Sequence, residues 1–365
     1  VENLGAVNIA GQESKIITRD LLLGGFNGKG IVNVSDNSTL TVDRVTQVGG
    51  FDEGGQNAIG ELNINDARVH TLEMVVGASG NGNVNIEGND SHINVDNNLL
   101  VGVNSGGIVT MNRANIESET PAVDGNNLWV KGDTILGSGA TGNGTLNVIN
   151  KNQFQTTNLV IGQKGIGNFK VSNTPFNVGL TKATDTTYIG GRGENSANAV
   201  GTLTIDNSAF VTPKLIVGNT GSGTLNLING GVISTDSIER NTASILSNIF
   251  IDGGEFRIKK DQSNLFANFT KDDLIEVSEK GISFETTGYN NGEVGTYVVI
   301  NPNAVITGNA GKLNVEDANG GFAKYGLGTL EISESSKQWT GDLTITQGTL
   351  KFNGNYIMGD DETLT

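Results

Sequence analysis

The chain has 365 residues, no cysteine, four prolines, 53 glycines and a net charge of −16 at pH 7. Its glycines follow no three-residue period, which excludes collagen, and the acidic balance argues against nucleic acid because phosphate binding needs clustered Lys and Arg. No apolar run approaches eighteen residues, so no transmembrane helix is expected. A hydrophobic content of 36% predicts a thin core behind one layer of short strands.

Short apolar runs that end in a glycine recur along the first 218 residues. The spacings between successive glycines are 25, 28, 25, 35, 25, 28 and 28 residues. The eight glycines are Gly24, Gly49, Gly77, Gly102, Gly137, Gly162, Gly190 and Gly218. A period of this length is typical of stacked repeats, in which one unit cannot bury its apolar face without neighbours.

A second motif follows each run after a short turn: a glycine, then alternating apolar and polar residues. Examples begin at Gly60, Gly144 and Gly223. Alternation over four or five residues predicts a half-buried strand. We therefore expect an all-β fold, a right-handed parallel β-helix (β-solenoid) of about fourteen rungs with about 4.8 Å between rungs. A β-sandwich is the alternative, but sandwiches rarely keep a glycine in one register over eight units.

Two turns, residues 50–59 and 191–200, are longer than the others and resemble each other in sequence. Insertions at one corner of a solenoid often form its working face, so Asp52, Glu53, Arg192 and Glu194 are candidate ligand-binding residues. The alternative is that surface loops tolerate extra residues.

The repeat predicts three segments. Residues 1–239 form regular rungs with a period of about 25–28, residues 240–320 form less regular rungs with more charge and phenylalanine, and order returns in residues 321–365.

The stretch from Gly320 to Phe352 contains three motifs in order: Gly326-Leu327-Gly328-Thr329-Leu330, Trp339-Thr340-Gly341 and Gly348-Thr349-Leu350. It resembles the passenger-associated transport repeat of bacterial (type V) autotransporters. The rungs before it resemble the passenger repeats of AIDA-type, self-associating adhesins.

This resemblance implies a passenger domain that is exported through an outer-membrane β-barrel and displayed on a Gram-negative cell surface, or released from it. Barrel strands with aromatic girdles are not evident in the sequence, so we expect a passenger without its translocator. The resemblance also implies that residues 321–352 assist folding. The lack of cysteine fits export of an unfolded chain, since a premature disulfide could block the pore.

No catalytic residue is predicted. The two histidines, His70 and His92, fall at different positions of their rungs, and no nucleophile elbow follows a strand. Zinc would need cysteine or paired histidines, and no calcium loop has the known spacing, so no metal or other cofactor is expected. A carbohydrate-active β-helix enzyme with clustered carboxylates is the alternative from the enzyme class.

The middle residue of each alternating strand should point to solvent. These residues are Asn33, Asn63, Asn85, Thr110, Asn147, Lys170, Thr204 and Asn226. All but Lys170 carry an amide or a hydroxyl, and we expect them to stack one rung apart as a ladder. Such a ladder hydrogen-bonds along the rod, and it offers the same groups to a second molecule. A purely structural role is the equal alternative.

The middle residue of each short apolar run is mostly apolar. The set is Leu22, Gln47, Val75, Leu100, Ile135, Val160, Tyr188 and Ile216. This stripe is covered, shifted in register by a bulge, or exposed for association. We favour covering or a register shift.

The leading hypothesis is a surface-displayed adhesin passenger that mediates cell–cell aggregation, biofilm formation or host attachment through its outward faces. Its partner is another copy, or a host surface protein or glycan. The alternative is a receptor- or glycan-binding module that uses the two long turns.

Overall fold

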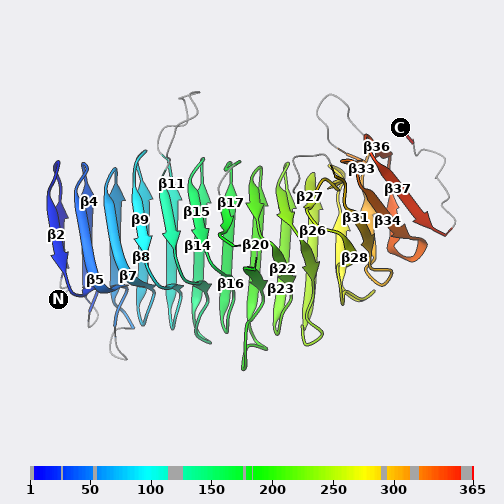
Figure 1. Ribbon diagram of the computed structural model, residues 1–365. Helices are drawn as coiled ribbons and strands as arrows, with labels where there is room; N and C mark the ends of the chain where they lie inside the picture. The colour runs from blue at the N-terminus through cyan, green and yellow to red at the C-terminus, as the bar shows by residue number, and fades with distance from the viewer. Residues whose placement is uncertain are drawn as a thin grey trace.

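The computed structural model describes residues 4–25, 28–51, 56–113, 126–175, 178–182, 184–288, 294–312, 320–354 and 364–365. Over these residues the chain is almost entirely β-structure, with no α-helix and one short 3₁₀ turn, η1 (Glu334–Ser336). The strands stack into a rod with the two chain ends at opposite ends (Figure 1). The predicted parallel β-solenoid is confirmed. None of the described segments forms a helix that is long and apolar enough to cross a membrane.

One side of the rod is a sheet of thirteen described strands, which we call the long sheet. The number of rungs predicted from the sequence is about fourteen. Its strands pair in parallel with their sequence neighbours in the sheet, without a register shift. The strands are β1 (Leu4–Ile9), β4 (Lys29–Ser35), β6 (Ile59–Asn65), β8 (Asn81–Glu87), β11 (Gly106–Asn112), β14 (Asn143–Ile149), β17 (Ile166–Ser172), β20 (Val200–Asp206), β23 (Ser222–Ile228), β26 (Leu246–Asp252), β29 (Leu274–Val277), β32 (Ile306–Asn309) and β35 (Lys337–Thr340).

The other two sides belong to a sheet of twenty described strands. We call it the bent sheet because β5 and β7 each run through both of its limbs. The first limb contains β2 (Lys15–Thr18), β5 (Thr39–Val48), β7 (Arg68–Val76), β9 (His92–Val95), β12 (Asn127–Val130), β15 (Gln153–Thr156), β18 (Val178–Leu180), β21 (Ala209–Val211), β24 (Val232–Thr235), β27 (Gly254–Ile258), β30 (Ile282–Glu285), β33 (Phe322–Tyr325) and β36 (Leu343–Ile345). The second limb adds β3 (Leu21–Leu23), β10 (Leu99–Val101), β13 (Thr134–Leu136), β16 (Leu159–Ile161), β19 (Thr186–Ile189), β22 (Lys214–Val217) and β25 (Ser237–Glu239).

A third, four-stranded sheet begins after β25, inside the segment that the sequence predicts to be irregular. It consists of β28 (Gln262–Leu265), β31 (Tyr297–Ile300), β34 (Thr329–Ser333) and β37 (Thr349–Asn353). The long sheet continues past residue 240 without interruption.

The core lies between the sheets, and each sheet contributes one layer of side chains to it. In the long sheet, alternate residues such as Leu62 and Ile64 are fully buried, and Ile64 stacks in register on Val34 and Ile86. Complete burial of one such side chain contributes about 1.5–3 kcal/mol. The predicted thin core is therefore a continuous column that every rung extends.

Glycine is required where the second limb turns back to the long sheet. Gly162 has φ +72°, and a Cβ there would lie 2.2 Å from the carbonyl oxygen of Val200. Gly167, which follows in β17, would place its Cβ 2.0 Å from the backbone nitrogen of Gly162. The two repeating glycines of the sequence therefore pack against each other at one corner, where no side chain fits.

The motifs near the C-terminus occupy successive rungs. Thr329 and Leu330 pair in register with Thr349 and Leu350, so the two Gly-Thr-Leu strands stack directly. Trp339 is buried, and its ring stacks on Phe322 with 4.4 Å between the ring centroids. Aromatic rings thus fill the core where the aliphatic repeat fades.

Lys324 is a fully buried lysine in these last rungs. Its Nζ donates hydrogen bonds to the carbonyl oxygens of Tyr325, Gly326 and Gln347 at 2.8, 2.7 and 3.0 Å. Desolvation by burial lowers the pKa of Lys324 from 10.5 to about 8. The ammonium therefore ties two successive turns together, at a desolvation cost.

This lysine predicts that the C-terminal rungs become more stable as the pH rises from about 8 to 9.5. Folded Lys324 loses its proton near pH 8 while the unfolded residue holds it to about 10.5, so the unfolded chain binds more protons across this window. Lys324→Met should abolish the rise in a urea denaturation series. Lys351→Met is the control and should keep it, because pairing with Glu331 raises the pKa of Lys351. A rise that persists in Lys324→Met contradicts the assignment.

Candidate functional site

The predicted ladder residues form one column on the outer face of the long sheet. Strand pairing places them directly opposite one another on successive strands, from β4 to β23, and all but the exposed Lys170 are only partly exposed. The column members are Asn33, Asn63, Asn85, Thr110, Asn147, Lys170, Thr204 and Asn226. Their predicted stacking one rung apart is confirmed.

Side-chain hydrogen bonds join the column in sections. Asn63 donates from Nδ2 to Oδ1 of Asn33 at 2.8 Å, and Asn85 donates to Asn63 at 2.8 Å. Further along, Asn147 donates to Thr110 at 3.4 Å and Asn226 donates to Thr204 at 3.1 Å. The ladder is thus a continuous amide chain at its N-terminal end and becomes a set of pairs beyond it.

Lys170 and Phe250 limit the ladder. Lys170 occupies the column between Asn147 and Thr204, and its Nζ lies 3.8 Å from an oxygen of Asp206. Phe250 follows Asn226 in register, so the amide and hydroxyl column ends at β26.

The structure adds residues that the sequence analysis missed. Asn8 begins the column, because Asn33 donates to its Oδ1 at 2.6 Å. A second polar column lies two residues earlier on the same strands, formed by Thr145, Asn168, Thr202, Thr224 and Asn248. The signal was present in the sequence, since the Thr of Gly-Thr-Leu-Asn supplies this column. We call the two columns together the polar face.

The long turn at 191–200 folds back onto the rod. The guanidinium of Arg192 lies over the Tyr188 ring at 5.6 Å and pairs with Asp133 at 2.7 Å. Arg192 follows β19 and Asp133 precedes β13, so this side chain crosses β16. Glu194 is exposed. Asp52 and Glu53, the candidates in the other long turn, lie outside the described residues.

The apolar stripe along the second limb is buried in one part and exposed in another. Ile135, Val160 and Ile216 in the second limb are buried, so the stripe is covered there, as we favoured. Leu22 is exposed, and Val75 and Leu100 are partly exposed. The stripe is therefore open towards the N-terminus, and further along it Tyr188, under the Arg192 guanidinium, is partly exposed.

A groove lies over the open part of the stripe, beside the first long turn. Its volume is about 1080 Å³, and its lining includes Gln47, Phe51, Gln56, Val75, Leu100 and Asn104. No charged side chain lines it among the described residues. The groove and the polar face are on different sides of the rod.

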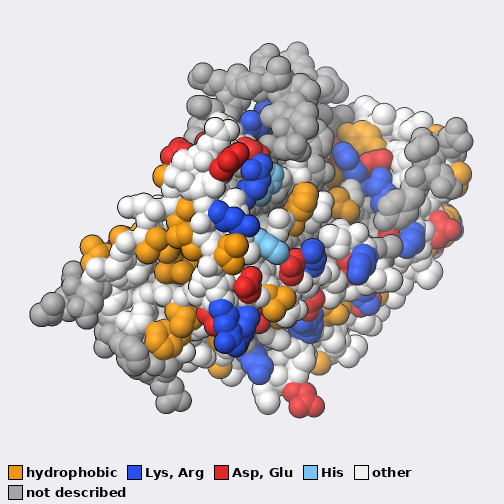
Figure 2. All heavy atoms as spheres, turned by 60° about the vertical axis from the view of Figure 1, so that its left-hand side comes forward, with side chains coloured by type: hydrophobic (Ala, Val, Ile, Leu, Met, Phe, Trp, Pro, Cys, Tyr) orange, Lys and Arg blue, Asp and Glu red, His pale blue; other side chains and the backbone are white. Residues whose placement is uncertain are grey.

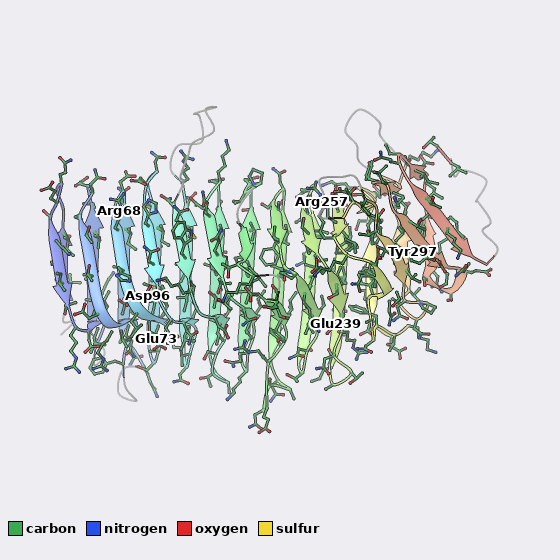
Figure 3. The ribbon with its side chains drawn as sticks, viewed as in Figure 1. Arg68, Glu73, Asp96, Glu239, Arg257 and Tyr297 are labelled. Carbon is green, nitrogen blue, oxygen red and sulfur yellow. The ribbon has the colours of Figure 1, made fainter. Side chains whose placement is uncertain are left out.

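The histidines and nearby carboxylates form hydrogen bonds on the first limb. His70 and His92 occupy different columns, as predicted, because His70 pairs in register with Asn94 and His92 pairs with Arg68. The carboxylate of Asp96 accepts from Lys131 and His70, and these hydrogen bonds lower its pKa. Figure 3 labels Arg68 and Asp96 on this part of the rod. Within the described residues, no three His, Asp or Glu side chains are arranged to hold a metal.

Comparison of the chain with models of known protein families, with curated proteins and with solved structures finds no match. The structure therefore assigns the chain to parallel β-solenoids by its fold alone.

Proposed function

We propose that this chain is the passenger domain of an autotransporter adhesin and that it associates with a second copy through the polar face of the long sheet. Export and display at a bacterial surface rest on the resemblance of residues 320–352 to the passenger-associated transport repeat. Self-association rests on the polar face itself.

The amide ladder is the observation that carries this proposal. A carboxamide has two N–H donors and an oxygen with two lone pairs. Asn63 uses one donor towards Asn33 and accepts once from Asn85. The structure shows no protein partner for its second N–H among the described residues. Each amide therefore keeps a donor and an acceptor site for another molecule, repeated about every 4.8 Å along the rod.

Exposed aliphatic side chains border the polar face. Ile166 and Val200 are neighbours in register at the start of their strands, and Leu246 lies two strands further on. Such residues supply the apolar contacts that hydrogen-bonded interfaces also contain. Many weak contacts along a rigid rod, and many rods on each cell, produce avidity without a deep pocket.

Sedimentation velocity of the purified chain tests the proposal. We expect dimers or larger species at about 150 mM salt and weaker association at about 10 mM, because a net charge of −16 repels a second copy when screening is weak. Neutral hydrogen bonds lose little at the higher salt. A chain that stays monomeric at every salt and protein concentration contradicts self-association.

A further inference from the structure

An exposed tryptophan lies on the first limb of the bent sheet, away from the polar face. Trp129 in β12 is 44% exposed, whereas the other tryptophan, Trp339, is buried. The residues before and after it in β12 that point inward, Leu128 and Val130, are buried in the core. Trp129 therefore faces outward by strand alternation and contributes nothing to the core.

Amide side chains flank this ring on both neighbouring strands. Asn94 pairs in register with Trp129 on one side, and Gln155 does so on the other. Asn94 is exposed and Gln155 is partly exposed, and the structure shows no side-chain hydrogen bond for either among the described residues. An aromatic platform thus has an available donor and acceptor about 4.8 Å away on each side.

The position beyond Gln155 in this column has no side chain. Gly179 is the next residue of this column, and a Cβ there would lie 2.2 Å from the carbonyl oxygen of Val211. From His70 onwards the column therefore reads Asn94, Trp129, Gln155 and then a position without a side chain. A flat ligand that covers Trp129 can extend over Gly179 as far as Val211, the next residue of this column, which is exposed.

The charges near the ring are already compensated. The carboxylate of Asp96 pairs with Lys131 and hydrogen-bonds with His70, and that of Asp90 pairs with Arg68 and lies 2.6 Å from His92. Figure 2 shows positive, negative and histidine side chains interleaved on this side of the molecule rather than a patch of one sign. This surface therefore suits an uncharged ligand.

We propose that Trp129, Asn94 and Gln155 form a binding site for a neutral oligosaccharide, independent of the polar face. The apolar C–H face of a pyranose stacks on the indole, while its hydroxyls exchange hydrogen bonds with the two amides. A sugar chain that runs along the rod meets one side chain per rung. A protein partner fits less well, because the apolar area here is a single ring between amides rather than a contiguous patch.

Native electrophoresis through gels that contain soluble β-glucan, galactomannan or dextrin tests this site. We expect at least one of these neutral polymers to retard the chain. Trp129→Ala should weaken binding about tenfold or more, as loss of a central aromatic contact does. Trp129→Phe should retain most of the binding, and Asn94→Ala and Gln155→Ala should each weaken it. Ile166→Ala removes an exposed aliphatic side chain on the long sheet and is the matched control, with unchanged retardation.

Tryptophan fluorescence gives a second readout, because Trp129 is the accessible one of the two tryptophans. The retarding polymer should shift its emission to shorter wavelength and protect it from acrylamide. Retardation by none of the three polymers overturns the proposal, and so does equal retardation of Trp129→Ala. If Trp129→Ala instead reduces self-association and no polymer binds, the ring belongs to a protein interface. Loss of self-association in other variants leaves this test unaffected.

Discussion

Gly162→Ala is expected to lower the free energy of unfolding by about 2–5 kcal/mol. Its φ of +72° costs an alanine about 1–2 kcal/mol, and the added Cβ would lie 2.2 Å from the Val200 carbonyl oxygen. The clash is with the backbone of the adjacent rung, so it can be relieved only if a strand moves. Overpacking of this kind costs about 1–3 kcal/mol more. Because each rung is supported by its neighbours, the damage spreads to both sides. Urea denaturation followed by circular dichroism measures the change.

Gly193→Ala is the matched control for this substitution. Gly193 also has a positive φ, +90°, but nothing lies within 4 Å of its added Cβ. Gly193→Ala should therefore lower the free energy of unfolding by the conformational cost alone, about 1–2 kcal/mol. Equal destabilisation by the two substitutions would mean that the close approach of rungs at the glycine corner has no energetic role.

Replacing Asn63, Asn85, Asn147 and Asn226 together by alanine is expected to abolish self-association while the rod stays folded. Each amide that is lost removes an intermolecular hydrogen bond worth about 0.5–1.5 kcal/mol, so four remove about 2–6 kcal/mol. The association constant should fall by at least about thirtyfold. Sedimentation velocity of the purified variant, with circular dichroism to verify folding, measures the effect.

A variant with four substitutions on the other side of the rod controls for a general loss of surface polarity. Asn94, Gln153, Gln155 and Ser234 are outward polar residues of the first limb, and their joint replacement by alanine should leave self-association intact. Undiminished self-association of the folded ladder variant would contradict the proposed role of the ladder.

The periodic features of the fold could be predicted from sequence because they are local. A glycine in one register and a strict apolar–polar alternation identify the turn and the strand of each rung without knowledge of the rest. Register then follows, since a shift by one residue would turn Leu62 and Ile64 out of the core. The ladder was predictable for the same reason, as it is the outward half of that alternation.

The contacts that give the surface its individual features were not predictable. Arg192 reaches Asp133, which is 59 residues away in sequence, and no local pattern specifies that partner. Trp129 lies in the 35-residue interval between Gly102 and Gly137, where the repeat is least regular. Its outward direction and its amide neighbours emerge only when β9, β12 and β15 are paired. The second polar column was equally readable, because it occupies the outward position two residues before each ladder residue in the same alternation.

Cross-linking through single cysteines tests the central claim most directly, because the chain has no cysteine of its own. Thr145→Cys, Thr202→Cys and Thr224→Cys place a thiol on the polar face and leave the amide ladder intact. Mixtures of the three variants also allow cross-links between two rods that associate in an antiparallel arrangement. His70→Cys, Gln155→Cys and Ser234→Cys place it on the first limb. With a short bismaleimide, covalent dimers are expected from the polar-face set alone. Dimers that form through the first limb, or through neither set while the chain still self-associates, would contradict association through the polar face.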